Sequence, residues 1–265
     1  MEETSIVRLN SIKQDIPVNT KNKTKAILFA PFATNSTKEN TSIPSSLTEV
    51  KKIKKLVSGD IFMDEQAGKK VFMDEAKKYP IIHLATHSSI NNYNPLKSEI
   101  FFYNNKDQTF TNNSIKFEEL YGLKLNSELV TLSACETGIG KEVKGRGILS
   151  LSNALNYAGV SSTVMSLWKV PDKETEQIMV SFYKHLKNGE TKDKALQNAK
   201  LDYLNTTSDQ ALKHPYYWAG FVISGDASPI KIDTPSIHLI WLVSGILVLI
   251  GLGLYFIKRN YKKVA

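Results

Sequence analysis

The sequence predicts an α/β fold built on a mostly parallel central sheet, with one transmembrane helix near the C-terminal end. Short apolar runs rich in β-branched residues alternate along the chain with segments whose apolar residues recur at helical spacing. Strands that alternate with helices form βαβ units, which place helices on both faces of a parallel sheet. The third observation is the uncharged apolar run over residues 237–257. At about 1.5 Å per residue, this run matches the roughly 30 Å hydrocarbon core of a bilayer.

Each predicted strand is an apolar run bounded by turn-forming residues. The run over 81–88 is entered through Pro80, and the run over 130–132 is followed by small and polar residues up to Gly138. The predicted strands span residues 25–32, 60–63, 81–88, 130–132, 162–168 and 218–225.

The predicted helices are recognised by their apolar faces and by the residues at their ends. Ser46 and Glu49 have the spacing of a capping box, and the helix they start ends at Gly59. The predicted helices span residues 46–59, 69–78, 148–158 and 171–189, followed by one that is capped by Thr191 and continues through Tyr203.

Two stretches between these elements have their own pattern. Residues 90–127 form a long excursion, in which 99–105 and 108–112 predict a hairpin and 117–121 predicts a short helical turn. Residues 141–147 are charged and contain glycine, which predicts a loop.

The domain organisation follows from where these runs begin and end. The α/β domain is expected over residues 25–228 and is preceded by a polar segment, 1–24, that reads as a linker or as the remnant of an upstream region. After it come a linker at 229–236, the transmembrane helix at 237–257 and a basic tail at 258–265.

The expected localisation is a single-pass membrane protein, and the side of the membrane on which the domain lies stays open. The positive tail after residue 257 favours the cytoplasm for the C-terminus, which would place the domain outside. Export of the domain would require an upstream signal, and residues 1–24 contain no apolar run of that kind.

Composition argues against a nucleic-acid partner and against a disulfide framework. The formal net charge is +8, but the excess is nearly all Lys; arginine, the residue suited to bidentate base and phosphate recognition, occurs only at Arg8, Arg146 and Arg259. Cys135 is the only cysteine, so it has no partner in the chain for a disulfide.

The segment from Ser133 to Gly138 places Cys135 just after the predicted central strand. A lone cysteine there is either a packed small thiol or a working one. His87 stands at the end of another predicted strand, and the carboxyl ends of parallel strands share one edge of a sheet. A histidine beside a thiol accepts its proton and creates a nucleophile, so the two residues are candidates for a catalytic dyad.

Several motifs occur together in one order. They are HLATHS (83–88), LSACETG (132–138), GRGILSLSNALNYAG (145–159) and SLWKVPD (166–172), continued by residues 183–200 and by YWAGFVISGD (217–226). In this order and spacing they resemble a CHAT domain over about residues 25–226. The resemblance implies a three-layer αβα caspase-like fold, membership of the caspase–separase clan of cysteine peptidases, and association with tetratricopeptide repeats, as is common in bacterial members.

The resemblance implies a role for residues at matching positions. His87 matches the catalytic histidine and Cys135 the nucleophile, and the backbone N–H groups of Ser88 and Cys135 match the oxyanion hole. Ser88 stands where the family usually has glycine, and it would be strained if the backbone there needs a positive φ. His83 is the other histidine of the motif, and it is interpreted as a hydrogen-bonded core residue.

Substrate choice is expected to depend on the loop after the strand that ends in Trp168. Asp172 is similar in position to an Asp with which separase-like peptidases receive a basic side chain, so cleavage after Lys or Arg is expected. The alternative is that Asp172 caps the following helix. Glu136 is a second acidic candidate, and Trp168 is either a wall of the pocket or part of the core.

The main hypothesis is a membrane-anchored cysteine endopeptidase that acts on a protein or peptide substrate. It needs no metal or organic cofactor, because His83 and His87 are too sparse for a zinc site. Its expected partners are a tetratricopeptide-repeat region, upstream or in a partner chain, and the membrane through residues 237–257.

Two other classes of function are open. One is a catalytically inactive signalling or scaffold module, which the serine at position 88 favours. The other is a flavodoxin-like small-molecule-binding domain, which lacks support because residues 31–34 do not form a glycine-rich phosphate loop.

Overall fold

In the computed structural model of the chain, one compact unit ends at Asp233 and a second begins at Thr234. The structure describes residues 7–8, 24–35, 42–89, 91, 94–103, 113–133, 141–143, 147–149 and 151–235. Of the second unit these ranges contain only residues 234 and 235. The predicted transmembrane segment, 237–257, and the tail after it therefore lie outside the described residues.

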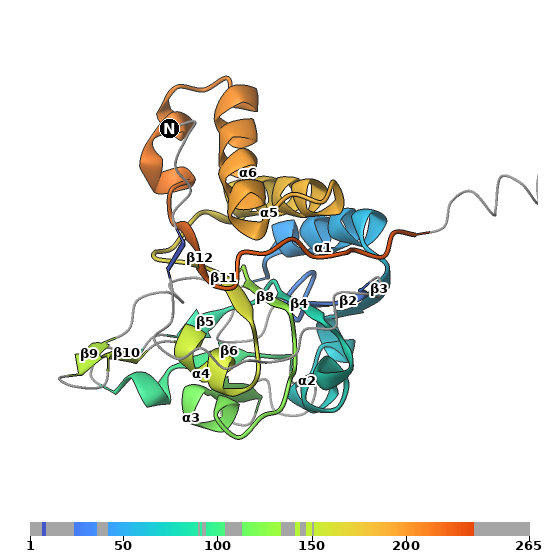
Figure 1. Cartoon of the computed structure of the whole chain (residues 1–265), viewed down its shortest axis with the longest axis vertical. Helices are drawn as coiled ribbons and strands as arrows, with labels where there is room; N and C mark the ends of the chain where they lie inside the picture. The colour runs from blue at the N-terminus through green and yellow to red at the C-terminus, as the bar shows by residue number, and fades with distance from the viewer. Residues whose placement is uncertain are drawn as a thin grey trace, which may run out of the picture. The chain divides into compact units, whose positions relative to one another are not determined.

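A seven-stranded sheet forms the centre of the first unit, in the order β1-β12-β11-β8-β4-β2-β3 (Figure 1). All neighbouring strands run parallel except β11 and β12, which are antiparallel. The mostly parallel sheet that the sequence predicted is therefore confirmed. The strands are β1 (Val7–Arg8), β2 (Ala26–Ala30), β3 (Gly59–Met63), β4 (Ile81–Leu84), β8 (Leu129–Leu132), β11 (Ser162–Ser166) and β12 (Phe221–Gly225).

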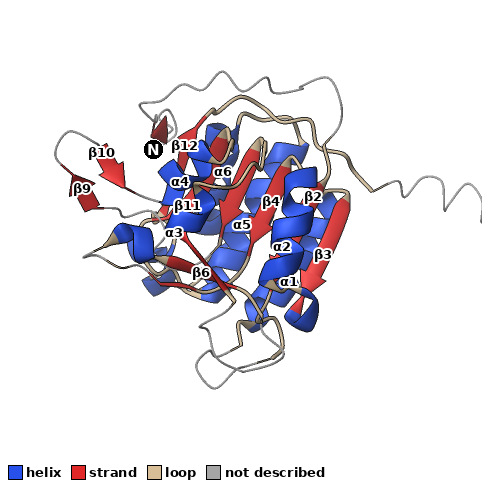
Figure 2. Cartoon of the chain, turned by 90° about the horizontal axis from the view of Figure 1, so that it is seen from below, coloured by secondary structure: helices blue, strands red, loops and turns tan. Residues whose placement is uncertain are grey.

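Helices cover both faces of this sheet, which gives three layers (Figure 1). One face carries α1 (Pro44–Leu56), α5 (Asp172–Lys187) and α6 (Lys192–Thr206), and the other carries α2 (Lys69–Glu75), α3 (Phe117–Leu120) and α4 (Leu151–Tyr157). Figure 2 shows the strands lying side by side between the helices. Short 3-10 helices occur at Asp64–Gln66, Ala76–Lys78, Pro95–Lys97, Ala211–Lys213 and Pro215–Tyr217.

The core is divided by the pleat of the strands. In β2, Leu28 belongs to the apolar cluster that includes residues of α1 and α5, whereas its neighbour Phe29 belongs to the cluster that includes Phe72 of α2. Successive side chains of a strand point to opposite faces, so an uninterrupted apolar run is what a strand buried on both faces requires.

Smaller sheets lie outside the central one, and they correct two predictions. In one, β6 (Glu99–Phe101) lies between β5 (Ser88–Ser89) and β7 (Ser114–Lys116), and both pairings are antiparallel. The described partners of 99–101 are thus 88–89 and 114–116, and the predicted partner 108–112 lies outside the described residues.

The second correction concerns the predicted charged loop. Within 141–147, β9 (Lys141–Val143) pairs antiparallel with β10 (Gly147–Leu149). Because residues 147–149 are used in this pairing, the helix predicted from residue 148 begins only at Leu151. The charged residues Lys141 and Glu142 and the glycines on either side of Arg146 favour a loop in the sequence, so local pattern alone did not indicate this pairing.

The predicted capping box at Ser46 is wrong. Helix α1 begins at Pro44, and its N-cap residue Ile43 makes no side-chain capping bond. Proline suits the first helical position because its ring presets φ and no helical N–H is lost there. The Ser46 hydroxyl instead donates to the Ile43 carbonyl at 2.7 Å, and Glu49 points into the protein, where it is 2% exposed.

Two segments that the sequence analysis treated as linkers contribute to the first unit. Val7–Arg8 adds a strand to the sheet next to β12. The predicted linker at 229–236 pairs with Thr24. The Thr24 N–H donates to the Lys231 carbonyl and the Asp233 N–H donates to the Thr24 carbonyl, both at 2.8 Å. Ile230 and Ile232 are buried beside this bridge, so the packed chain continues past residue 228.

Candidate active site

Two parallel strands at the middle of the sheet carry the chain to the candidate site. In β4 and β8, Leu84 lies opposite Leu132, so both strands end at the same edge. The Ser133 N–H continues the pairing and donates to the Leu84 carbonyl at 2.9 Å. His87 follows β4 at this edge, while Cys135 and Glu136, which follow β8 in the sequence, lie outside the described residues.

His87 is held at both its backbone and its ring. It lies beyond the end of β4, which stops at Leu84 and not at residue 88 as predicted. Its carbonyl accepts a hydrogen bond from the Phe101 N–H at 3.0 Å, so strand β6 fixes the backbone. The ring packs on the buried Phe32, with 5.1 Å between the ring centroids, and is itself half-buried. A base that is held by packing keeps its orientation without losing contact with solvent.

Ser88 begins β5 and lies opposite Ile100 in an antiparallel pair. Among the described non-glycine residues, only Asp64 and Asn126 have a positive φ. Serine therefore occupies position 88 without the backbone strain that a left-handed conformation would impose.

His83 lies in the core, as predicted, and its partner is a residue that the sequence analysis assigned to a helix cap. The ring is fully buried, and Nε2 lies 2.9 Å from Oε1 of Glu49. The two atoms are within ion-pair distance but are not aligned for a hydrogen bond. The other carboxyl oxygen of Glu49 accepts a hydrogen bond from the Ser133 hydroxyl at 3.1 Å.

Trp168 lies beyond the carboxyl end of β11, the neighbour of β8 on the side away from β4. Its indole N–H donates to the Tyr216 carbonyl at 2.9 Å, and its ring packs closely on Gly220. A Cβ at position 220 would lie 3.0 Å from Cε2 of Trp168, so glycine leaves the space that the indole fills. Trp168 also packs against the core cluster on the α5 face.

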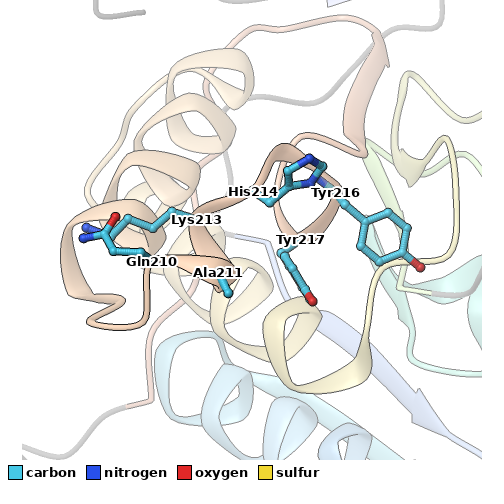
Figure 3. A pocket seen from close by; sticks show the side chains of 6 residues that line it. All are labelled: Gln210, Ala211, Lys213, His214, Tyr216 and Tyr217. Carbon is cyan, nitrogen blue, oxygen red and sulfur yellow. The ribbon is translucent and has the colours of Figure 1, made fainter.

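A surface pocket adjoins the segment that holds Trp168 (Figure 3). Tyr216 and Tyr217 project in different directions from one short turn, with their rings 5.4 Å apart and nearly perpendicular. The pocket is lined by Gln210, Ala211, Lys213, His214, Tyr216 and Tyr217.

Asp172 is the first residue of α5 and is exposed. The N-cap of this helix is Pro171, and no side chain makes a capping bond, so the interpretation of Asp172 as the cap is wrong. A carboxylate in the first turn still complements the positive end of the helix dipole. The exposed carboxylate lies at the start of α5, directly after the short β11–α5 connection that contains Trp168.

Two negative findings apply to the described residues alone. Their His, Cys, Asp and Glu side chains form no group of three or more that would hold a metal ion. None of the helices in the described part of the chain is both long and apolar enough to cross a membrane.

The model of a known family matches most of the chain. Residues 2–226 match the family model described as CHAT domain. The chain belongs to the CHAT domain family. This agrees with the order of motifs from HLATHS to YWAGFVISGD in the sequence.

Curated relatives of this CHAT domain are much longer proteins. The mouse and human proteins named Tetratricopeptide repeat protein 28 are each 32% identical to it over 118 residues, which is 44% of this chain. The match covers 5% of the mouse protein and 4% of the human one, so it spans only a small part of either.

Solved structures show the fold of the CHAT domain. The Arg-specific cysteine proteinase gingipain R matches 78% of this chain and 47% of its own, with a TM-score of 0.52 and 11% identity. A chain described only as a protease matches 81% of this chain and 50% of its own, with a TM-score of 0.55 and 12% identity. Separase of Saccharomyces cerevisiae, in complex with securin, matches 79% of this chain and 12% of its own, with a TM-score of 0.50 and 13% identity. At these identities the likeness concerns the caspase-like fold.

Proposed function

We propose that this CHAT domain is a cysteine endopeptidase in which His87 is the general base and Cys135 the nucleophile. The observation that carries the proposal is the pairing of β4 with β8 as adjacent parallel strands that end together. His87 follows the first strand and Cys135 follows the second in the sequence. In α/β sheets, ligands and reacting groups gather at the carboxyl edge of such strands.

The proposed reaction is an acyl transfer in two steps. His87 accepts the proton of the Cys135 thiol, and the thiolate adds to the carbonyl carbon of the scissile peptide bond. The N–H groups of Ser88 and Cys135 stabilise the resulting oxyanion. His87 then donates the proton to the leaving amine as the C–N bond breaks, and a water molecule, deprotonated by His87, hydrolyses the thioester.

Specificity for a basic residue before the cut is proposed from the exposed carboxylate of Asp172. Asp172 directly follows the β11–α5 connection, whose Trp168 would form a wall of the pocket, and Glu136 is a second acidic candidate. A carboxylate in a substrate pocket attracts the side chain of Lys or Arg by charge and by hydrogen bonding.

Covalent labelling of the full chain tests the dyad. A peptidyl electrophile that reacts with thiols and carries Arg next to the reactive group should label wild-type protein and fail to label Cys135→Ala. The variant His87→Ala should be labelled far more slowly, since the base is lost. Labelling of Cys135→Ala at the wild-type rate would contradict the proposal, and absence of labelling in wild type would favour a signalling or scaffold module.

The role of Asp172 in the proposed substrate pocket is tested with a matched pair of aspartate substitutions. Asp172→Asn should lower the preference of an Arg electrophile over a neutral one by about tenfold, as expected for one lost charged contact. Asp193→Asn, in the first turn of α6, makes the same change at a helix start away from the β11–α5 connection and should keep the preference. Equal preferences in both variants would remove Asp172 from the pocket.

The membrane anchor and the regulation are further parts of the proposal. Residues 237–257 would insert as one helix, so Leu247→Lys together with Ile250→Lys should release the protein from the membrane fraction. A double variant that remains in that fraction would argue against this anchor. Control by a tetratricopeptide-repeat region, upstream or in a partner chain, is supported by the names of the curated relatives.

A further inference from the structure

A buried carboxyl group lies directly below the candidate edge of the sheet. Glu49 of α1 is 2% exposed, and each of its two oxygens meets a different strand. Oε1 lies 2.9 Å from Nε2 of His83 in β4, and Oε2 accepts a hydrogen bond from the Ser133 hydroxyl, just after β8, at 3.1 Å. One side chain on a helix thus contacts both strands that lead toward the proposed dyad.

A buried polar pair, Tyr183 and Thr131, lies next to this group. Tyr183 of α5 presents its ring to His83 edge-on, with 5.5 Å between the centroids, and its hydroxyl pairs with that of Thr131 at 3.2 Å. Burial raises the pKa of the Tyr183 hydroxyl, so that it stays protonated. The Glu49 carboxyl group itself contacts His83 and Ser133.

Stability alone gives a weak reason for such an arrangement. Taking a carboxyl group and an imidazole out of water costs several kcal/mol, and well-packed apolar residues of similar volume often serve as well or better. Among the described residues, neither ring nitrogen of His83 has an aligned hydrogen-bond partner. What the group does supply is a fixed geometry between α1, the body of β4 and the end of β8.

The contacts of Glu49 restrain the two segments that lead to the proposed catalytic residues. Ser133 receives two restraints, from its hydroxyl to Glu49 and from its N–H to the Leu84 carbonyl. Cys135 follows Ser133 two positions later, and His87 follows His83 along the same segment. A dyad loses much of its rate when its members are displaced by about 1 Å, so the strand ends must be held together.

We propose that Glu49 is a positioning residue, which through Ser133 and His83 sets the relative placement of the two strand ends that carry Cys135 and His87. The inference rests on the proposed cysteine-peptidase function and deepens it. In this proposal Glu49 acts through Ser133 and His83, so its effect is expected in the reactivity of the thiol.

The test compares two hydroxyls that are removed by the same substitution. Ser133→Ala removes the link between Glu49 and β8. Ser152→Ala is the control, because the Ser152 hydroxyl makes a buried contact of 2.9 Å with Thr163, between α4 and β11 on the other face of the sheet. Glu49→Gln keeps the shape of the side chain and removes its capacity for charge.

The readout is the rate at which iodoacetamide alkylates the full chain, measured from about pH 5 to about pH 9. Because the chain has one cysteine, the signal reports Cys135 alone. In wild type, pairing with His87 should give alkylation well below the pH at which a free thiol reacts. In Ser133→Ala and Glu49→Gln we expect the rate near pH 6 to fall about tenfold and the profile to move toward that of a free thiol. Ser152→Ala should stay within about twofold of wild type.

The outcomes separate the inference from the function on which it rests. If wild type alkylates like a free thiol at every pH, the dyad is absent and both proposals are overturned. If wild type shows the reactive thiol and Ser133→Ala keeps it as Ser152→Ala does, the peptidase proposal stands and the positioning role is overturned. Should Glu49→Gln fail to fold, Ser133→Ala decides the question by itself.

Discussion

Two histidines in this protein meet carboxyl groups, and their surroundings differ. His83, in the middle of the sheet, is fully buried and lies against Glu49 and the ring of Tyr183, and among the described residues its ring nitrogens have no aligned hydrogen-bond partner. The side chain of His185, near the end of α5, is 16% exposed and places each ring nitrogen on a carboxylate, Nδ1 on Glu190 at 2.7 Å and Nε2 on Asp202 at 2.9 Å.

Each of the two carboxylates around His185 also accepts a hydrogen bond from another side chain. Asp202 also accepts a hydrogen bond from the Ser181 hydroxyl at 2.5 Å, and Glu190 accepts one from the Asn198 amide at 2.7 Å. Burial lowers the pKa of His185, but the hydrogen bonds to Glu190 and Asp202 outweigh it, so the pKa is raised overall. These contacts join α5 to α6 and their connecting turn, and stability accounts for them.

The two histidine clusters differ in their position in the fold and in how completely their polar atoms are hydrogen-bonded. The α5–α6 cluster lies at the periphery, satisfies its polar atoms and connects two helices. The Glu49 cluster lies in the core and contacts the strands that precede the candidate catalytic residues, and in the described part of the chain some of its polar atoms have no aligned partner. Departures from full satisfaction are expected where a site has to be held in one geometry.

Glu49→Ala should have the largest effect on stability. It leaves His83 and the Ser133 hydroxyl without their partner in a region closed to water, which should cost about 3 kcal/mol in the free energy of unfolding. Urea denaturation measures this loss. Asp74→Ala is the control, because Asp74 pairs with Lys70 and their side chains are 54% and 88% exposed, so its loss should be far smaller. Equal losses in the free energy of unfolding would show that truncating Glu49 costs no more than breaking an exposed ion pair.

Tyr183→Phe should have an intermediate effect. It removes the hydroxyl that pairs with Thr131, a residue with no exposed surface, and should lower the free energy of unfolding by about 1–2 kcal/mol. Adding Thr131→Val removes the stranded partner as well, so the double variant should be more stable than the sum of the two single losses implies. Strict additivity in this double-mutant cycle would mean that the two hydroxyls do not interact.

The sequence predicted the layers of this fold better than it predicted the contacts inside them. The apolar runs of β2, β4 and β8 are long, uncharged and bounded by turn residues, so their strands and their parallel order could be recognised. The capping box failed because Ser and Glu at this spacing also occur inside a helix whose start is set by a preceding proline, here Pro44.

The partners of the two histidines were beyond local pattern. Glu49 and His83 belong to different elements that only the folded sheet brings together, and no spacing rule connects them. The polar residues of the α5–α6 cluster resemble an ordinary solvated helix face in the sequence. His87 was assigned to the correct edge because a residue that follows a parallel strand must lie there, whereas its packing on Phe32 depends on the loop after β2.

His185→Gln should have the smallest effect, and its dependence on pH distinguishes the peripheral cluster. The pKa of His185 is raised in the folded state, so its contribution is complete below the ordinary value near 6.5 and is lost as the pH rises through the folded value. At about pH 5.5 wild type should exceed the variant by about 1 kcal/mol, a figure kept low because the cluster is partly exposed. At about pH 8.5 the difference should have largely disappeared.

The pKa of Asp202 sets the lower limit of this pH window. Burial raises that pKa, but hydrogen bonds from Ser181 and His185 outweigh it, so it lies below its ordinary value. The contribution of Asp202 is therefore present above that ordinary value and is lost as the pH falls through the folded one. His214→Gln, at an exposed histidine, is the control for the change of residue. A difference between wild type and His185→Gln that grows from pH 5.5 to 8.5 would contradict an imidazolium held between two carboxylates, since only the charged ring attracts both.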